Sequence, residues 1–92
     1  KFVFEGFLSN KSAKRRRRLE ELSREKRTVI IYESPHRIVK FLEDLAGIDA
    51  EKEVAVAREL TKKFEEVVRG TASEVLEHFR EKRPRGEFIV IF

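Results

Sequence analysis

A cluster of cationic side chains near the start of the chain is the strongest candidate for chemistry in the sequence. Six Lys or Arg residues fall within eight positions with no acidic residue among them: Lys11, Lys14, Arg15, Arg16, Arg17 and Arg18. Guanidinium groups pair with two phosphate oxygens at once, so the phosphates of RNA are the partner that this cluster suits. A helix predicted from Ser12 to Lys26 would hold these cations in its N-terminal half, where the helix dipole repels them. We therefore predict an RNA-binding arm, with a solvated surface helix as the alternative.

The excess of positive charge is confined to this arm. The chain has 21 basic and 17 acidic residues, so without these six cations 15 basic residues face 17 acidic ones. A single basic patch favours one local contact with nucleic acid over general attraction to anions.

The segment Tyr32-Glu33-Ser34-Pro35-His36-Arg37 is the second candidate site. Ser34 suits a helix N-cap and Pro35 the first helical turn, after a predicted strand from Thr28 to Glu33. Free backbone N–H groups at such a strand end bind ligands in open α/β sheets. His36 and Arg37 place positive charge at the helix N-terminus, which suits an anion or a partner surface. A helix start without a ligand is the alternative.

The third segment, Arg58-Glu59-Leu60-Thr61-Lys62, is followed by Glu65, Glu66 and Arg69. Its alternating charges alone indicate a hairpin tip whose exposed ion pairs are each worth less than about 1 kcal/mol. No metal site is expected, because His36 and His78 are far apart in sequence and the chain has no cysteine. The sequence also lacks a phosphate-binding glycine loop and the order of a nucleophilic triad.

Apolar periodicity predicts an α/β fold, a mixed five-stranded sheet with flanking helices in the order β-α-β-α-β-β-α-β. The run 28–33 is typical of a strand buried on both faces, and Gly47 is expected to end the helix after it. Thr71 and Glu74 form a capping box before a helix with a buried apolar face. The predicted strands cover residues 2–7, 28–33, 54–57, 64–69 and 88–92, with the last strand central.

Length and composition predict a single domain over residues 1–92. No apolar run reaches the roughly 20 residues of a membrane helix, so no membrane contact is expected. The absence of cysteine fits a reducing cytoplasm. The chain begins and ends within predicted core strands, which is typical of a piece taken from a longer protein.

Several motifs, in order along the chain, resemble those of the ribosomal RNA small-subunit methyltransferase I family within the tetrapyrrole (corrin/porphyrin) methylase superfamily. The resemblance spans nearly the whole chain. The matching stretches are Phe4-Glu5-Gly6-Phe7-Leu8, the basic arm with Arg18-Leu19-Glu20-Glu21-Leu22, Tyr32-Glu33-Ser34-Pro35-His36-Arg37, Val56-Ala57-Arg58-Glu59-Leu60-Thr61-Lys62, and Glu65-Glu66 with Arg69-Gly70-Thr71.

This resemblance implies the second, C-terminal domain of a two-domain enzyme whose N-terminal cofactor-binding domain lies outside the chain. Such enzymes bind S-adenosylmethionine between the domains, methylate the ribose 2′-hydroxyl of a cytidine in small-subunit ribosomal RNA, and form homodimers. The family pattern places Tyr32, Glu33 and Ser34 at the cofactor cleft, with Glu33 or Glu59 as the candidate proton acceptor. The RNA or the interdomain surface is then contacted by the basic arm together with His36, Arg37, Arg58 and Lys62. The chain alone is expected to be inactive.

Other classes of function remain open. A stand-alone RNA-binding module rests on the basic arm alone, because the Phe and Tyr residues fall in strands predicted to be buried and leave no aromatic platform for bases. A dimerisation domain, or the C-terminal domain of another tetrapyrrole-methylase-type methyltransferase, is also compatible with the sheet. A single domain can combine several of these roles.

Overall fold

The computed structural model describes the backbone of residues 1–60, 63–81 and 85–92, and the side chains of residues 1–58, 66–81 and 85–92. Within these residues the chain forms five strands and three helices in the predicted order. The α/β class with a mixed five-stranded sheet is therefore confirmed. The elements are β1 (Phe2–Phe7), α1 (Ser12–Ser23), β2 (Thr28–Glu33), α2 (Ile38–Ile48), β3 (Glu53–Leu60), β4 (Lys63–Thr71), α3 (Ala72–Glu81) and β5 (Glu87–Ile91).

The strands lie in the order β1-β2-β5-β3-β4. Only β1 and β2 run parallel, while β5 pairs antiparallel with both β2 and β3, and β3 pairs antiparallel with β4. The predicted hairpin of the third and fourth strands is confirmed. The last strand is central as predicted, because β5 lies between β2 and β3, and its Phe88 and Val90 side chains are buried.

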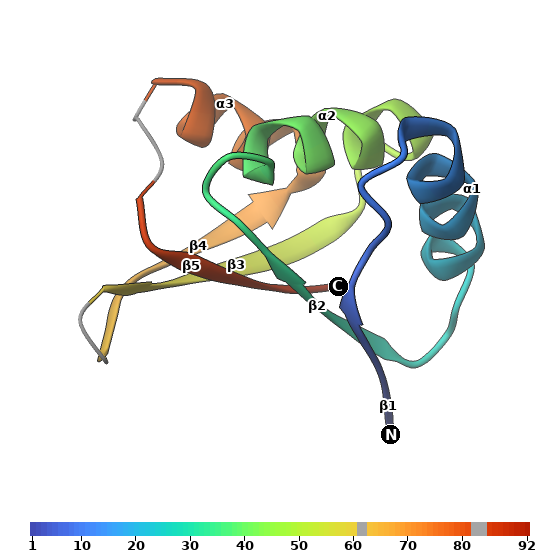
Figure 1. The fold of residues 1–92 in the computed structure, drawn as a ribbon, viewed down its shortest axis with the longest axis horizontal. Coiled ribbons are helices and arrows are strands. Elements are labelled where there is room, and N and C mark those ends of the chain that lie inside the picture. Colours follow the sequence, from blue (N-terminus) through green and yellow to red (C-terminus); the bar gives the residue numbers. More distant parts are fainter. Residues whose placement is uncertain (61–62, 82–84) are drawn as a thin grey trace.

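The three described helices lie together over one face of the sheet (Figure 1). The apolar core fills the space between these two layers and includes Phe41, Leu42 and Leu45 of α2 together with Val29 and Ile31 of β2. The opposite face carries no described helix. The run 28–33 was predicted to be buried on both faces, and this was wrong: Val29, Ile31 and Glu33 face the helices, whereas Tyr32 is exposed.

A bulge in β1 changes which face its last side chains occupy. Phe4 pairs with Ile30, Gly6 with Ile31 and Phe7 with Tyr32, so Glu5 is the extra residue. Gly6 has a φ of 73°, a left-handed conformation that glycine adopts without steric cost. Because side chains alternate along a strand, the bulge turns Phe7 to the same open face as Phe4.

The helix after β2 begins later than predicted. Residues 35–37 form a turn in which the N–H groups of Arg37 and Ile38 both donate to the carbonyl of Ser34, at 3.1 and 3.0 Å. Ser34 therefore does not cap the helix with its side chain, and Arg37 occupies the N-cap position. The turn is favoured because Ile38, the first helical residue, is fully buried against the core.

The ends of α1 and α2 also differ from the prediction. Gly47 does not end α2, which continues to Ile48 because that side chain packs against the core. The helix α1 ends at Ser23 and not at Lys26, since Leu22 is the last buried apolar residue on it. The capping box of α3 is confirmed: the N–H of Thr71 donates to Glu74 Oε1 at 2.9 Å, and the N–H of Glu74 donates to Thr71 Oγ1 at 3.2 Å.

Candidate functional site

The helix α1 carries the predicted basic arm, but not all of the arm faces solvent. Arg15 is only 5% exposed, and its Nε lies 3.1 Å from Asp44 Oδ2 on α2. Lys40 and Arg16 approach the other oxygen of Asp44, at 3.8 and 4.0 Å. Arg15 thus ties α1 to α2 and has little access to a ligand.

The helical spacing could have revealed the position of Arg15. Leu19 and Leu22, the buried apolar residues of α1, lie four and seven positions after Arg15, which places all three on one face of the helix. An arginine on that stripe is predicted to point inward and to need a buried acid. The identity of the acid could not be predicted, because Asp44 is 29 residues away.

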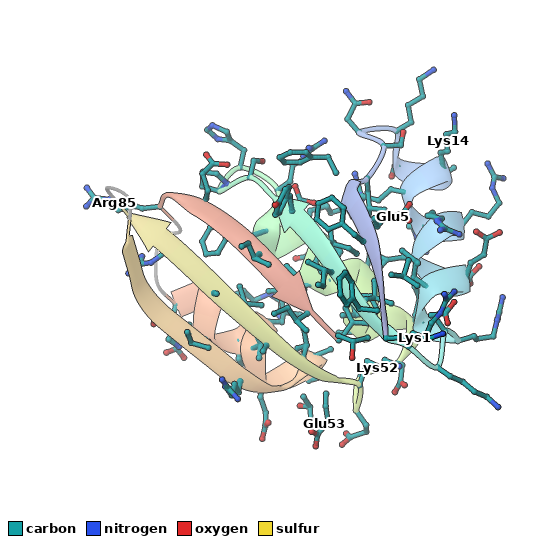
Figure 2. The ribbon with its side chains drawn as sticks, turned by 90° about the horizontal axis from the view of Figure 1, so that it is seen from below. Lys1, Glu5, Lys14, Lys52, Glu53 and Arg85 are labelled. Atoms are coloured by element: carbon teal, nitrogen blue, oxygen red, sulfur yellow. The ribbon has the colours of Figure 1, made fainter. Side chains whose placement is uncertain are left out.

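Arg18 ties the same helix to the sheet. Its Nε and one terminal nitrogen donate to the two oxygens of Glu5 on β1, at 2.9 and 2.8 Å, and its other terminal nitrogen donates to Glu21 at 2.9 Å. These hydrogen bonds from Arg18 lower the pKa of Glu5, against the opposing effect of partial burial. The same bonds raise the pKa of the Arg18 guanidinium. Figure 2 shows Glu5 between β1 and α1.

Three cations of the arm remain available. Lys11, Lys14 and Arg17 are exposed, and no ion pair joins them to another described residue. Lys14 projects from α1 away from the sheet (Figure 2). We call these three residues the basic ridge. Its ammonium and guanidinium groups can neutralise phosphates without first giving up an ion pair.

The carboxyl end of β2 divides its predicted site residues between two faces. Tyr32 points to the open face, whereas Glu33 is 1% exposed and points toward the helices. The Oε1 atom of Glu33 accepts a hydrogen bond from the N–H of Ser34 at 2.9 Å and lies 3.2 Å from Arg37 Nε. Glu33 therefore braces the turn that follows the strand. His36 is exposed at the tip of this turn.

A hollow opens on the sheet beside Tyr32. Its volume is about 300 Å³, and it is lined by Phe7, Tyr32, Glu87, Phe88 and Ile89. This volume is at the lower end of the range of about 300–1,000 Å³ found for small-molecule pockets. Of the three predicted cofactor-site residues, Tyr32 lines this hollow, whereas Glu33 and Ser34 do not.

A third group of polar residues lies between β3, β4 and α3. Glu66 has a partner on each side: Arg58 Nη2 forms an ion pair with its Oε1 at 3.3 Å, and His78 Nε2 lies 3.0 Å from its Oε2. Arg58 Nε is buried without a hydrogen-bond partner among the described residues. The linear sequence held no signal for the His78–Glu66 contact. Lys62 and the side chain of Glu59, both predicted site residues, lie outside the described residues.

Neither a metal site nor a membrane-spanning helix is found in the described part of the chain. It holds no group of three His, Cys, Asp or Glu side chains placed to bind a metal ion. None of the helices in that part is long and apolar enough to cross a membrane.

The model of the family Tetrapyrrole (Corrin/Porphyrin) Methylases matches residues 1–76, and the chain belongs to this family. Its relatives include proteins named ribosomal RNA small subunit methyltransferase I. One from Synechocystis is 46% identical over 99% of the chain, one from Bacillus subtilis is 44% identical over 98%, and one from Thermotoga maritima is 44% identical over 99%. The chain spans 33%, 31% and 40% of the length of these three relatives.

Proposed function

We propose that this chain is the RNA-gripping, cofactor-bordering part of an S-adenosylmethionine-dependent methyltransferase that acts on small-subunit ribosomal RNA. The names of its relatives support the substrate and the reaction. The observation that carries the RNA contact is the basic ridge. Arg15 and Arg18 are engaged with acids and hold α1 in place, while Lys11, Lys14 and Arg17 remain exposed along it.

The finer activity that we propose is methylation of a ribose 2′-hydroxyl of a cytidine. A preceding domain of the longer protein would supply most of the cofactor site, and this chain would form the opposite wall of the cleft. The complete enzyme would act as a homodimer in the cytoplasm. The 92-residue chain alone would be inactive, because one wall cannot align a methyl donor with an acceptor.

In this proposal the cations of the basic arm divide into two roles. Lys11, Lys14 and Arg17 bind phosphates, and Arg16 lies at the edge of the ridge. Arg15 and Arg18 position the helix through their bonds to Asp44 and Glu5. His36 extends the RNA or interdomain surface from the turn after β2, with Arg37 held beside it by Glu33. Arg58 and Lys62 would add contacts from the β3–β4 hairpin.

The cofactor is proposed to lie at the carboxyl end of β2. When bound, S-adenosylmethionine supplies a methyl group on its sulfonium. Because Tyr32 and Glu33 point to opposite faces, contact would come from the backbone of residues 32–34 and the hydroxyl of Ser34. The buried Glu33 carboxylate already accepts from Ser34 and faces Arg37, so we assign it a bracing role. Glu59 is then the remaining candidate to accept the hydroxyl proton.

The test is RNA binding by the chain across a series of salt concentrations. Each phosphate contact contributes about −0.7 to the slope of log affinity against log salt for single strands, and about −0.9 for duplexes. Changing Lys11, Lys14 and Arg17 together to Ser should therefore reduce the slope by about 2 to 3. The matched control changes Lys1, Lys26 and Arg85, three exposed cations with the same total charge, to Ser. Equal slopes for the ridge variant and the control would refute the assignment.

A further inference from the structure

Three aromatic rings form a cluster on the open face of the sheet. The rings of Phe4 and Phe7 lie against Tyr32 with centroids 5.2 and 5.5 Å away, both edge-on. Their side chains are 55%, 58% and 37% exposed in the order Phe4, Phe7, Tyr32. The sequence had predicted these three aromatic residues to be buried, and this was wrong because the described helices cover only the other face of the sheet.

The bulge in β1 builds this cluster. Without the extra residue Glu5, strand alternation would turn Phe7 toward the helices and away from Phe4. The positive φ of Gly6 lets the chain make the bulge, and the shifted register sets Phe7 beside Tyr32. Bulges commonly re-aim side chains at functional edges. Burial in the core does not explain the arrangement, since all three rings remain more than a third exposed.

The cluster lies near the basic ridge. Phe7 is followed by Leu8, Ser9 and Asn10 before Lys11, so at most about 14 Å of extended chain separates Phe7 from Lys11, the first residue of the ridge. Viewed on the open face, α1 lies beyond the edge strand β1 (Figure 2). The hollow of about 300 Å³ lies on the other side of Phe7 and Tyr32. A single nucleic-acid strand can therefore meet cations and aromatic surface within a few nucleotides.

Resting on the proposed function, we propose that Phe4, Phe7 and Tyr32 stack unpaired bases of the RNA strand whose phosphates bind the basic ridge. Proteins that hold single strands combine cationic side chains that follow the backbone with exposed rings on which bases stack. A protein partner suits this corner less well, because charged residues are depleted from the centres of protein interfaces. Exposed cations beside exposed rings complement RNA in both charge and shape.

Tyr32 makes the proposal directly measurable. It is the only tyrosine of a chain that has no tryptophan, so the tyrosine fluorescence of the protein reports on the cluster. A single-stranded oligouridine RNA should quench this fluorescence as it binds. Inorganic polyphosphate should compete for the basic ridge and leave the fluorescence unchanged, because it has no bases.

Variants separate stacking from charge. Phe4→Leu with Phe7→Leu keeps exposed apolar residues on β1 and leaves the reporter in place. This variant should bind the RNA about tenfold more weakly with an unchanged salt slope. Phe2→Leu is the matched control: Phe2 is 62% exposed on the same strand, with no ring contact to Tyr32, and its replacement should leave the affinity unchanged.

Four results would overturn the proposal, and they differ in what they imply. RNA binding through the ridge without quenching would refute stacking and leave the proposed function standing, whereas no RNA binding at all would refute both. Tyrosine fluorescence that changes with protein concentration in the absence of RNA would show that a second copy covers the cluster. Quenching by S-adenosylmethionine alone would show that the rings line the cofactor site.

Discussion

Removing the carboxylate of Asp44 should cost more stability than any other single change to a charged residue of α1 or its partners. The Asp44 side chain is 5% exposed and has Arg15, Lys40 and Arg16 within 4.0 Å. In Asp44→Ala the guanidinium of Arg15 stays buried without its partner, and such a loss costs about 3–5 kcal/mol. Domains have a total stability of about 5–15 kcal/mol, so the variant should be close to unfolding.

Urea denaturation followed by circular dichroism measures this loss. With a slope of about 1–3 kcal/mol per molar urea, a loss of 3 kcal/mol lowers the midpoint by about 1–3 M. The double variant Arg15→Met with Asp44→Leu should lie within about 1 kcal/mol of the parent, because it removes both buried charges and fills their space. Glu5→Gln weakens the more exposed pair with Arg18 and should cost no more than about 1 kcal/mol at neutral pH.

A loss of stability in Asp44→Ala no larger than that in Glu5→Gln would contradict this prediction. Arg15 would then reach solvent in solution, and the basic ridge would gain a fourth free cation. An Arg15→Ala variant that loses RNA affinity without losing stability would point the same way. The salt-slope experiment would distinguish a buried Arg15 from an exposed one. A fourth phosphate contact, made by an exposed Arg15, would add about 0.7 to the magnitude of the slope.

Two further predictions concern pH and helix capping. Because Arg18 holds the pKa of Glu5 below 4.5, the stabilisation from this pair is present above that pH and is lost as the pH falls through the lowered value. The free energy of unfolding should therefore drop less steeply in Glu5→Gln than in the parent as the pH is lowered below 4.5. The hydrogen bond from Arg27 lowers the pKa of Glu25 to about 2. Because this pair is the same in the parent and in Glu5→Gln, its contribution cancels when the two proteins are compared. Thr71→Ala removes the acceptor for the N–H of Glu74 and should cost about 1 kcal/mol, or roughly 4–8 °C in Tm, while Ser73→Ala on the exposed side of α3 should change Tm little.

Local patterns were enough to predict most of the elements of this fold. The capping box of Thr71 and Glu74, the buried face of α3 and the apolar run of β5 are signals contained within a few residues. They formed as predicted because their hydrogen bonds and burial depend on near neighbours. The motif resemblance likewise indicated the family that the comparisons show.

The predictions failed where an outcome depended on residues far apart in sequence. The start of α2 shifted to Ile38 because the core took that side chain, and Gly47 stayed helical because Ile48 packs inside. The burial of Arg15 depends on Asp44, which lies on another helix. Each case was decided by burial against a partner that no local window contains.

Residue types and helical spacing thus defined the elements, the family and the presence of a basic arm. Which of its cations remain free, and which aromatic rings face solvent, followed from the packing of helices on one face of the sheet and from the bulge at Gly6. The physical reason is that secondary structure is set largely by neighbours along the chain, whereas exposure is set by what the assembled layers cover.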